Sequence, residues 1–254
     1  MNSPSPAQPE SETKRILSES LLRELNGVAD NLFTFGANRV FNENLLRKNI
    51  EMNPFQVDFV AFRNDPKIKE KYLARVRAHR AADQIIKGKY WEDGRGCAVG
   101  CTVHSDSHTA YEKELGIPRI LARLEDGIFE GLPNGKALAW PEAFLEAIPV
   151  GADLSLVWPK FAVWLLGDPN EGVIRFAKTE RTKKAIQATV DAYQLVIEGT
   201  AESVDWGKLR AAAYADAAAD AAADDAAYAA TAKSKARVRQ SEKLLELLSV
   251  TEGK

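Results

Sequence analysis

The chain has 254 residues, of which 45% are hydrophobic and 28% are charged, and its 34 Lys and Arg nearly balance its 36 Asp and Glu. These values are typical of a globular protein that buries a core, and they argue against broad nucleic-acid binding, which needs a basic surface. No apolar run approaches the roughly 20 residues that cross a bilayer, and the polar start lacks the apolar core of a signal peptide. We therefore expect a cytoplasmic protein without a membrane span.

The first part of the chain combines a polar arm with helices. Residues 1–12 are rich in Pro, Ser and Glu, which predicts a disordered arm. Leucines spaced three to four residues apart predict a helix over residues 13–28. Asp65 and Pro66 form a typical helix start, and the apolar spacing that follows predicts a helix that continues to Gly88.

The outer face of this helix is basic. Its cations are Lys67, Lys69, Lys71, Arg75, Arg77 and Arg80. Such a face is usually solvated, and a site for an anionic ligand is the alternative. His79 stands alone on the same helix, which favours a surface histidine over a ligand.

Further helices are predicted over residues 119–130, 141–148, 154–166 and about 174–198. The segment 154–166 is apolar almost all round, so we expect it at the centre of the core, with Pro159 kinking or restarting it. No stretch alternates with the period of two that is typical of strands. The sequence thus predicts a mainly α protein, a multi-helix bundle with little or no sheet, whose globular domain covers residues 13–200.

The C-terminal part, residues 201–254, is dominated by alanine: 16 of the 26 residues from 211 to 236 are Ala. Alanine is the strongest helix former, so we predict one helix of roughly 40 residues. Asp216, Asp220 and Asp224 would line one edge of it, more plausibly as a solvated edge than as a ladder for metal ions. The end of the helix is amphipathic through Leu244 and Leu248, and can dock on the body or make a homo-oligomer.

Residues 88–118 hold the side chains most suited to chemistry. Cys97, Cys101, His104 and His108 follow one another at spacings of 4, 3 and 4, which would place them on one face of a continuous helix. Two Cys and two His are the ligands of a structural zinc. Because four such residues span about 16 Å along a straight helix, a shared zinc requires the helix to break near residues 105–107.

Three other interpretations of this segment remain open. Cys97 at a helix start next to Arg95 can be a thiol nucleophile of lowered pKa, with His104 or His108 as its base. The cysteines can instead be small apolar residues of a buried helix. Finally, a polar ligand site can be lined by Tyr90, Trp91, Arg95, His104 and His108.

A resemblance bears on the same segment. The residues 90–91, 94–104, 111–112 and 114–118 resemble a block in uncharacterised bacterial and phage-encoded helical proteins that also end in an Ala-rich helix. The likeness covers roughly residues 72–166. It implies a mobile-element context and no particular activity.

From the sequence we expect a cytoplasmic accessory protein that binds a small ligand or a protein partner through residues 88–118. The alternatives are a thiol-dependent enzyme using Cys97 and a zinc-stabilised interaction module.

Overall fold

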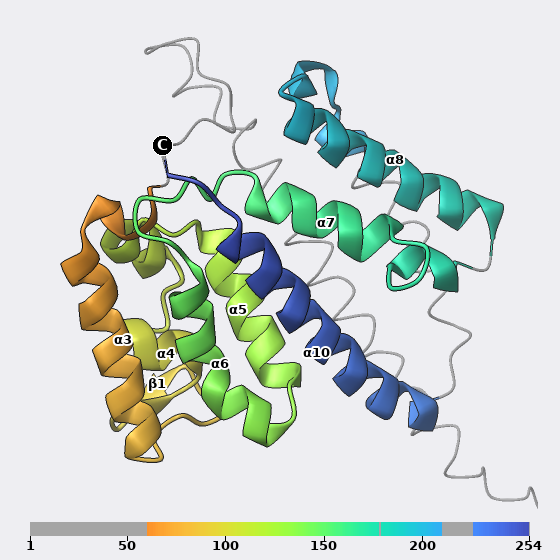
Figure 1. Cartoon of the computed structure of the whole chain (residues 1–254). Helices are drawn as coiled ribbons and strands as arrows, with labels where there is room; N and C mark the ends of the chain where they lie inside the picture. Colours follow the sequence, from red (N-terminus) through yellow and green to blue (C-terminus); the bar gives the residue numbers. More distant parts are fainter. Residues whose placement is uncertain (1–59, 178, 210–225, 254) are drawn as a thin grey trace, which may run out of the picture.

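The structure, a computed structural model, describes residues 60–177, 179–209 and 226–253 (Figure 1). The predicted disordered arm, the predicted helix over residues 13–28 and the three aspartates of the alanine tract lie outside these ranges.

The described residues are mainly helical, as predicted, with a two-stranded hairpin as their sheet. The helices are α3 (Pro66–Ala81), α4 (Ala98–Val103), α5 (Arg119–Gly131), α6 (Asn134–Ala147), α7 (Val157–Gly167), α8 (Glu180–Glu198) and α10 (Ala226–Ser249). The strands are β1 (Trp91–Glu92) and β2 (Arg95–Gly96), and the short helical turns are Ala61–Asn64, Tyr111–Leu115, Val173–Phe176 and Ala201–Ser203.

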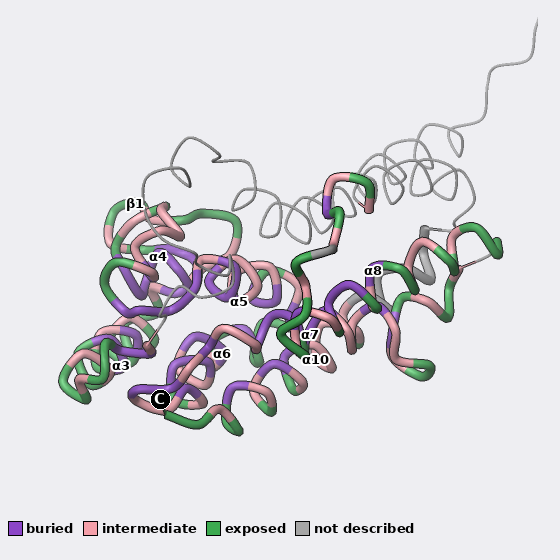
Figure 2. Tube along the Cα trace, turned by 90° about the horizontal axis from the view of Figure 1, so that it is seen from above, coloured by how far each residue is buried: buried purple, intermediate pink, exposed green. Residues whose placement is uncertain are grey.

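The helices pack around one core. α3 packs against α4 and α6, while α10 lies along α5, α6 and α7, and α7 pairs with α8 (Figure 1). α4 is buried along its whole length (Figure 2). The aromatic side chains of Phe129, Phe144 and Phe161 bring α5, α6 and α7 into this core, and Leu244 and Leu248 of α10 are also fully buried.

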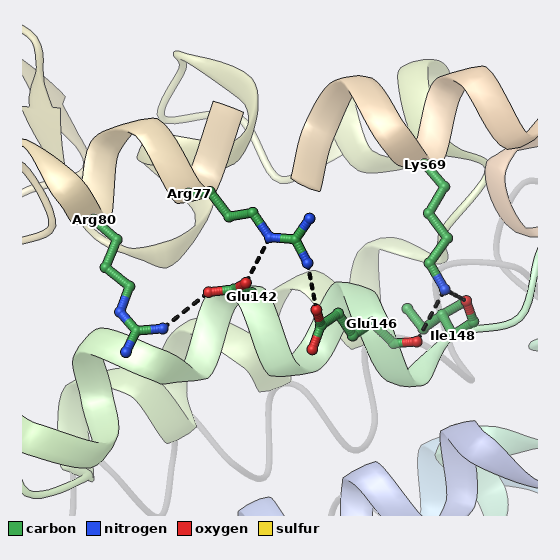
Figure 3. Close-up of polar contacts among 6 residues, drawn as sticks. All are labelled: Lys69, Arg77, Arg80, Glu142, Glu146 and Ile148. Atoms are coloured by element: carbon green, nitrogen blue, oxygen red, sulfur yellow. Dashed lines mark hydrogen bonds and ion pairs between the residues drawn. The ribbon is translucent and has the colours of Figure 1, made fainter. Parts of the chain in front are cut away.

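Three of the six cations on the basic face of α3 contact the neighbouring helix α6 or the residue that follows it (Figure 3). Arg77 binds Glu142 at 2.6 Å and Glu146 at 2.5 Å, and Arg80 binds Glu142 at 2.9 Å. Lys69 donates hydrogen bonds of 2.9 and 2.7 Å to the last carbonyls of α6, those of residues 146 and 148. Carboxylates and carbonyls of the same chain therefore pair with three of the six cations of this face.

Two helix boundaries differ from the prediction at the ends of α3 and α6. α3 ends at Ala81, not at Gly88, because Asp83 adopts a left-handed conformation and the chain then pairs with β2. α6 begins at Asn134, not at Pro141, so this proline lies inside the helix.

Two further boundaries differ around α7 and α8. α7 begins at Val157, not at residue 154. The segment predicted as one helix over 174–198 divides into the turn Val173–Phe176 and α8, which starts after Thr179. The Thr179 hydroxyl accepts a hydrogen bond of 3.0 Å from the Thr182 amide, which is a typical helix cap. Pro159 falls in the first turn of α7, where a missing amide proton costs no helical hydrogen bond.

The loop before α7 joins the two ends of the described body. Ala61 donates to the carbonyl of Ala152 at 3.0 Å, and Asp153 donates to that of Glu252 at 3.1 Å. The amphipathic end of α10 is thus docked on the body. No helix within the described ranges is long and apolar enough to span a membrane.

Candidate functional site

The hairpin of β1 and β2 forms the outer part of the segment 88–118. Its strands are antiparallel and are joined by Asp93 and Gly94, which both have positive φ, as two-residue hairpin turns require. Gly96 also bonds the chain that leaves α3: its amide donates to Gln84 at 3.1 Å and its carbonyl accepts from Ile86 at 2.8 Å. The hairpin is therefore tied to the body along β2.

Two glycines allow the hairpin to sit directly on α4. A Cβ atom at Gly96 would lie 2.0 Å from the carbonyl oxygen of Tyr90, and one at Gly100 would lie 1.5 Å from the same oxygen. The Cys97 amide donates to the carbonyls of Lys89 at 2.7 Å and Tyr90 at 3.2 Å. The glycine spacing of this block is thus a packing requirement.

Both cysteines belong to the interior of this scaffold. Cys97 and Cys101 are buried, and the Cys101 thiol donates to the carbonyls of Gly96 at 3.3 Å and Gln84 at 3.6 Å. Burial raises the pKa of Cys101 to about 12. Burial and then the negative charge of Asp126 raise the pKa of Cys97 still further. The expectation of a lowered thiol pKa at the helix start is wrong, because desolvation outweighs the helix-terminal amides.

The predicted zinc ligands Cys97, Cys101, His104 and His108 do not share one helix face. α4 ends at Val103, and His104 takes a left-handed conformation with φ of 55°. The two histidines then enter different side-chain clusters. Within the ranges that the structure describes, no group of three or more His, Cys, Asp or Glu side chains is arranged to hold a metal ion.

His104 belongs to what we term the imidazole–indole cluster, made of His79, Gln84, Trp91 and His104. Its ring stacks on Trp91 with 4.3 Å between centroids and 15° between planes. Its Nε2 atom lies 2.8 Å from Nε2 of His79, and Nδ1 of His79 lies 2.6 Å from Oε1 of Gln84. Burial, followed by the charges of Arg75 and His79, lowers the pKa of His104.

His108 belongs to what we term the carboxylate cluster, made of His108 and the α5 residues Glu125 and Asp126. Its Nε2 atom lies 3.7 Å from Oδ2 of Asp126, and its ring meets that of Tyr90 edge to face at 5.5 Å. Asp126 thus interacts with both the thiol of Cys97 and the imidazole of His108. Together with burial, its negative charge raises the pKa of the thiol, which is the opposite of what activation of a nucleophile requires.

Glu125 lies behind Asp126 and is fully buried. Its Oε2 atom accepts a hydrogen bond of 2.6 Å from the hydroxyl of Tyr111. Burial raises the pKa of Glu125 well above the usual value for a glutamate. Among the described residues, Oε1 of Glu125, Oδ1 of Asp126 and Nε2 of His108 are buried without a hydrogen-bond partner. The carboxylate cluster thus gathers unsatisfied polar atoms beneath the hairpin.

The site predicted from the sequence did not include His79, Glu125 or Asp126. Glu125 could have been found, because it interrupts the apolar stripe of Leu121, Ile128 and Phe129 on α5. His79 had no local signal, since its contact with His104 joins residues 25 positions apart.

Each of the predicted ligand-site residues is exposed or partly exposed, and His104 is among the exposed ones. Tyr90, with 45% of its surface exposed, and Arg95, also exposed, lie on the hairpin with the partly exposed Trp91. Trp91 contacts His104, and Tyr90 contacts His108. The hairpin therefore connects the two clusters.

Comparison of the chain with models of known protein families gave no match, and neither curated protein sequences nor solved structures matched it.

Proposed function

We propose that this chain is a cytoplasmic accessory protein of bacterial or phage origin that binds another molecule through its 88–118 segment. A protein partner fits the surface better than a small ligand. The observation that carries the proposal is the grouping of Tyr90, Trp91 and Arg95 on one hairpin with their side chains partly or fully exposed. Tyr, Trp and Arg are the residue types that contribute most binding energy at protein interfaces.

The way in which the hairpin is held supports this role. Hydrogen bonds to Gly96 fix β2 against the chain after α3, and the Cys97 amide holds the carbonyls of residues 89 and 90. A recognition surface that is ordered before binding loses less conformational entropy when the complex forms.

A small ligand is the second candidate for the same face. The exposed ring of Tyr90 can stack on a planar group, and the Arg95 guanidinium can pair with an anionic one. Thermal-shift measurements with a panel of nucleotides and aromatic carboxylates separate the two candidates, because a small ligand raises the melting temperature of the isolated protein.

The partner hypothesis is tested with Arg95→Glu and Tyr90→Ser. Wild-type protein and both variants are immobilised and exposed to bacterial extract, and each captured protein is then purified and titrated calorimetrically. A true partner binds the wild type and loses at least tenfold in affinity with both variants. Phe176→Ser is the matched control, because Phe176 is a 66% exposed aromatic residue outside the hairpin.

Equal affinity for the wild type and the hairpin variants would contradict the proposal. So would an equal loss in the Phe176 control. Melting temperatures of all variants are measured first, so that a loss of folding is not read as a loss of contact.

Self-association through the amphipathic end of the C-terminal helix has less support, because Leu244 and Leu248 are already buried within this chain. Any homo-oligomer would therefore use a surface that does not include these two leucines.

A further inference from the structure

We propose that His79 and His104 together bind a divalent transition-metal ion, with Cu²⁺ as the preferred ion. This site shares only His104 with the four-residue zinc set, and it does not depend on the proposed partner function. The two histidines supply two nitrogen ligands, and water completes the coordination.

The distance between the two nitrogens fits this role. Nε2 of His79 and Nε2 of His104 lie 2.8 Å apart. Two nitrogens bound to one ion at about 2.0–2.1 Å stand about 2.8–3.0 Å apart at a right angle and about 3.3–3.4 Å apart at a tetrahedral angle. The observed separation matches adjacent corners of a square, the geometry that Cu²⁺ and Ni²⁺ favour.

The hydrogen bond of His79 prepares its Nε2 atom for a metal ion. The carbonyl oxygen of Gln84, 2.6 Å from Nδ1 of His79, can only accept, so Nδ1 carries the hydrogen. In the neutral ring Nε2 then presents a lone pair. Histidines that bind metals usually donate their other ring N–H to an oxygen in this way.

His104 is held from the other side. Its ring stacks on Trp91, and Trp91 also meets His79 edge to face at 5.3 Å. In the metal-free pair His104 donates its Nε2 hydrogen to His79. When an ion binds, it replaces this hydrogen bond: the rings turn so that both Nε2 lone pairs face the ion, and His104 carries its hydrogen on Nδ1 instead, so both rings stay neutral and no proton is lost.

The electrostatic surroundings are mixed. His79 lies in the last turn of α3, where the helix dipole favours a cation. Arg75 acts on His104 in the opposite sense, although its guanidinium donates to the Thr102 carbonyl at 2.8 Å, and Glu114 offsets part of its charge. Because the two imidazoles are neutral and Arg75 repels a metal ion, only an ion with a high intrinsic affinity for nitrogen ligands can bind here. Among the divalent ions of the first transition row, that ion is Cu²⁺.

The test is a titration of untagged protein with Cu²⁺, in which binding is monitored by tryptophan fluorescence and by electron paramagnetic resonance. A paramagnetic ion at this site quenches Trp91, which stacks on one of its ligands. We expect one Cu²⁺ per chain and an axial resonance spectrum with splitting from two nitrogens. Ni²⁺ is titrated in parallel, because it does not oxidise the two cysteines.

Three variants identify the ligands. His79→Ala and His104→Ala should each weaken binding at least tenfold, and His108→Ala, which changes the remaining histidine of the chain, should stay within twofold of the wild type. The wild-type resonance spectrum needs no variant to fold, so it decides the question by itself if a substitution unfolds the protein. A spectrum without two nitrogen ligands, or a loss of binding only in His108→Ala, would overturn the proposal.

Discussion

Gly100 gives the sharpest test of how the hairpin is packed. In Gly100→Ala the new Cβ atom would lie 1.5 Å from the carbonyl oxygen and 2.6 Å from the carbonyl carbon of Tyr90. Real Cβ contacts are essentially never below 3.0 Å, so the backbone at Tyr90 must retreat by about 1.5 Å or more. That movement also disturbs the hydrogen bonds that the Cys97 amide makes to the carbonyls of Lys89 and Tyr90.

The magnitude follows from opposing effects. Overpacking in a well-packed core costs about 1–3 kcal/mol, and each weakened hydrogen bond adds about 1 kcal/mol. Against this, alanine improves on glycine inside a helix by about 1 kcal/mol. We expect Gly100→Ala to lower the free energy of unfolding by about 3 kcal/mol, which corresponds to a fall in melting temperature of roughly 6–12 °C for a chain of this size.

The control is Gly127→Ala in α5. Gly127 is also inside a helix, but a Cβ atom there meets nothing within 4 Å, so only the gain in helix propensity remains. We expect this variant to be more stable than the wild type by about 0.5–1 kcal/mol. Both variants are compared by urea and thermal unfolding followed by circular dichroism. If Gly100→Ala is as stable as Gly127→Ala, the packing of Tyr90 on α4 is wrong.

Three further predictions concern ionisable groups. The ion pair with Arg77 lowers the pKa of Glu142. The stability that this ion pair contributes is therefore present above the ordinary glutamate pKa and is lost as the pH falls through the lowered value. In urea titrations, acid should destabilise the wild type more than Glu142→Gln. Glu125 has the opposite sign, because burial raises its pKa. Stability should therefore fall by about 1.4 kcal/mol per pH unit between the ordinary glutamate pKa and the raised pKa of Glu125. A Glu125→Gln variant should lack this slope, and identical slopes in both proteins would contradict the prediction. Finally, a thiol reagent such as DTNB should label neither Cys97 nor Cys101 in the native protein and both in urea, while rapid native labelling would restore the thiol-enzyme hypothesis.

The sequence predicted the features that depend on local patterns. Apolar spacing located α5 and the body of α8, and the Asp65-Pro66 pair located the start of α3, where the Asp65 side chain does accept the Lys67 amide. The end of α3 was missed, because the strand pairing of the chain after it depends on Gly96, more than ten residues away.

The candidate site was predicted as a segment but not as a geometry. Residues 88–118 do contain exposed aromatic and charged side chains. The spacing of their cysteines and histidines suggested a shared helix face or a helix that breaks near residues 105–107; the helix ends at Val103, and His104, with a left-handed backbone, meets His79 of α3. Contacts of this kind join distant parts of the chain, and the period of a single helix carries no information about them.

The loop before α7 places both ends of the described body at the same end of α3. Val60 and Gly253 both pair with residues of this loop, beside the start of α3, whereas His79 and the hairpin lie at the far end of that helix. A helix of 16 residues is about 24 Å long. The partner surface proposed for the hairpin and the two ends of the described body therefore lie at opposite ends of α3.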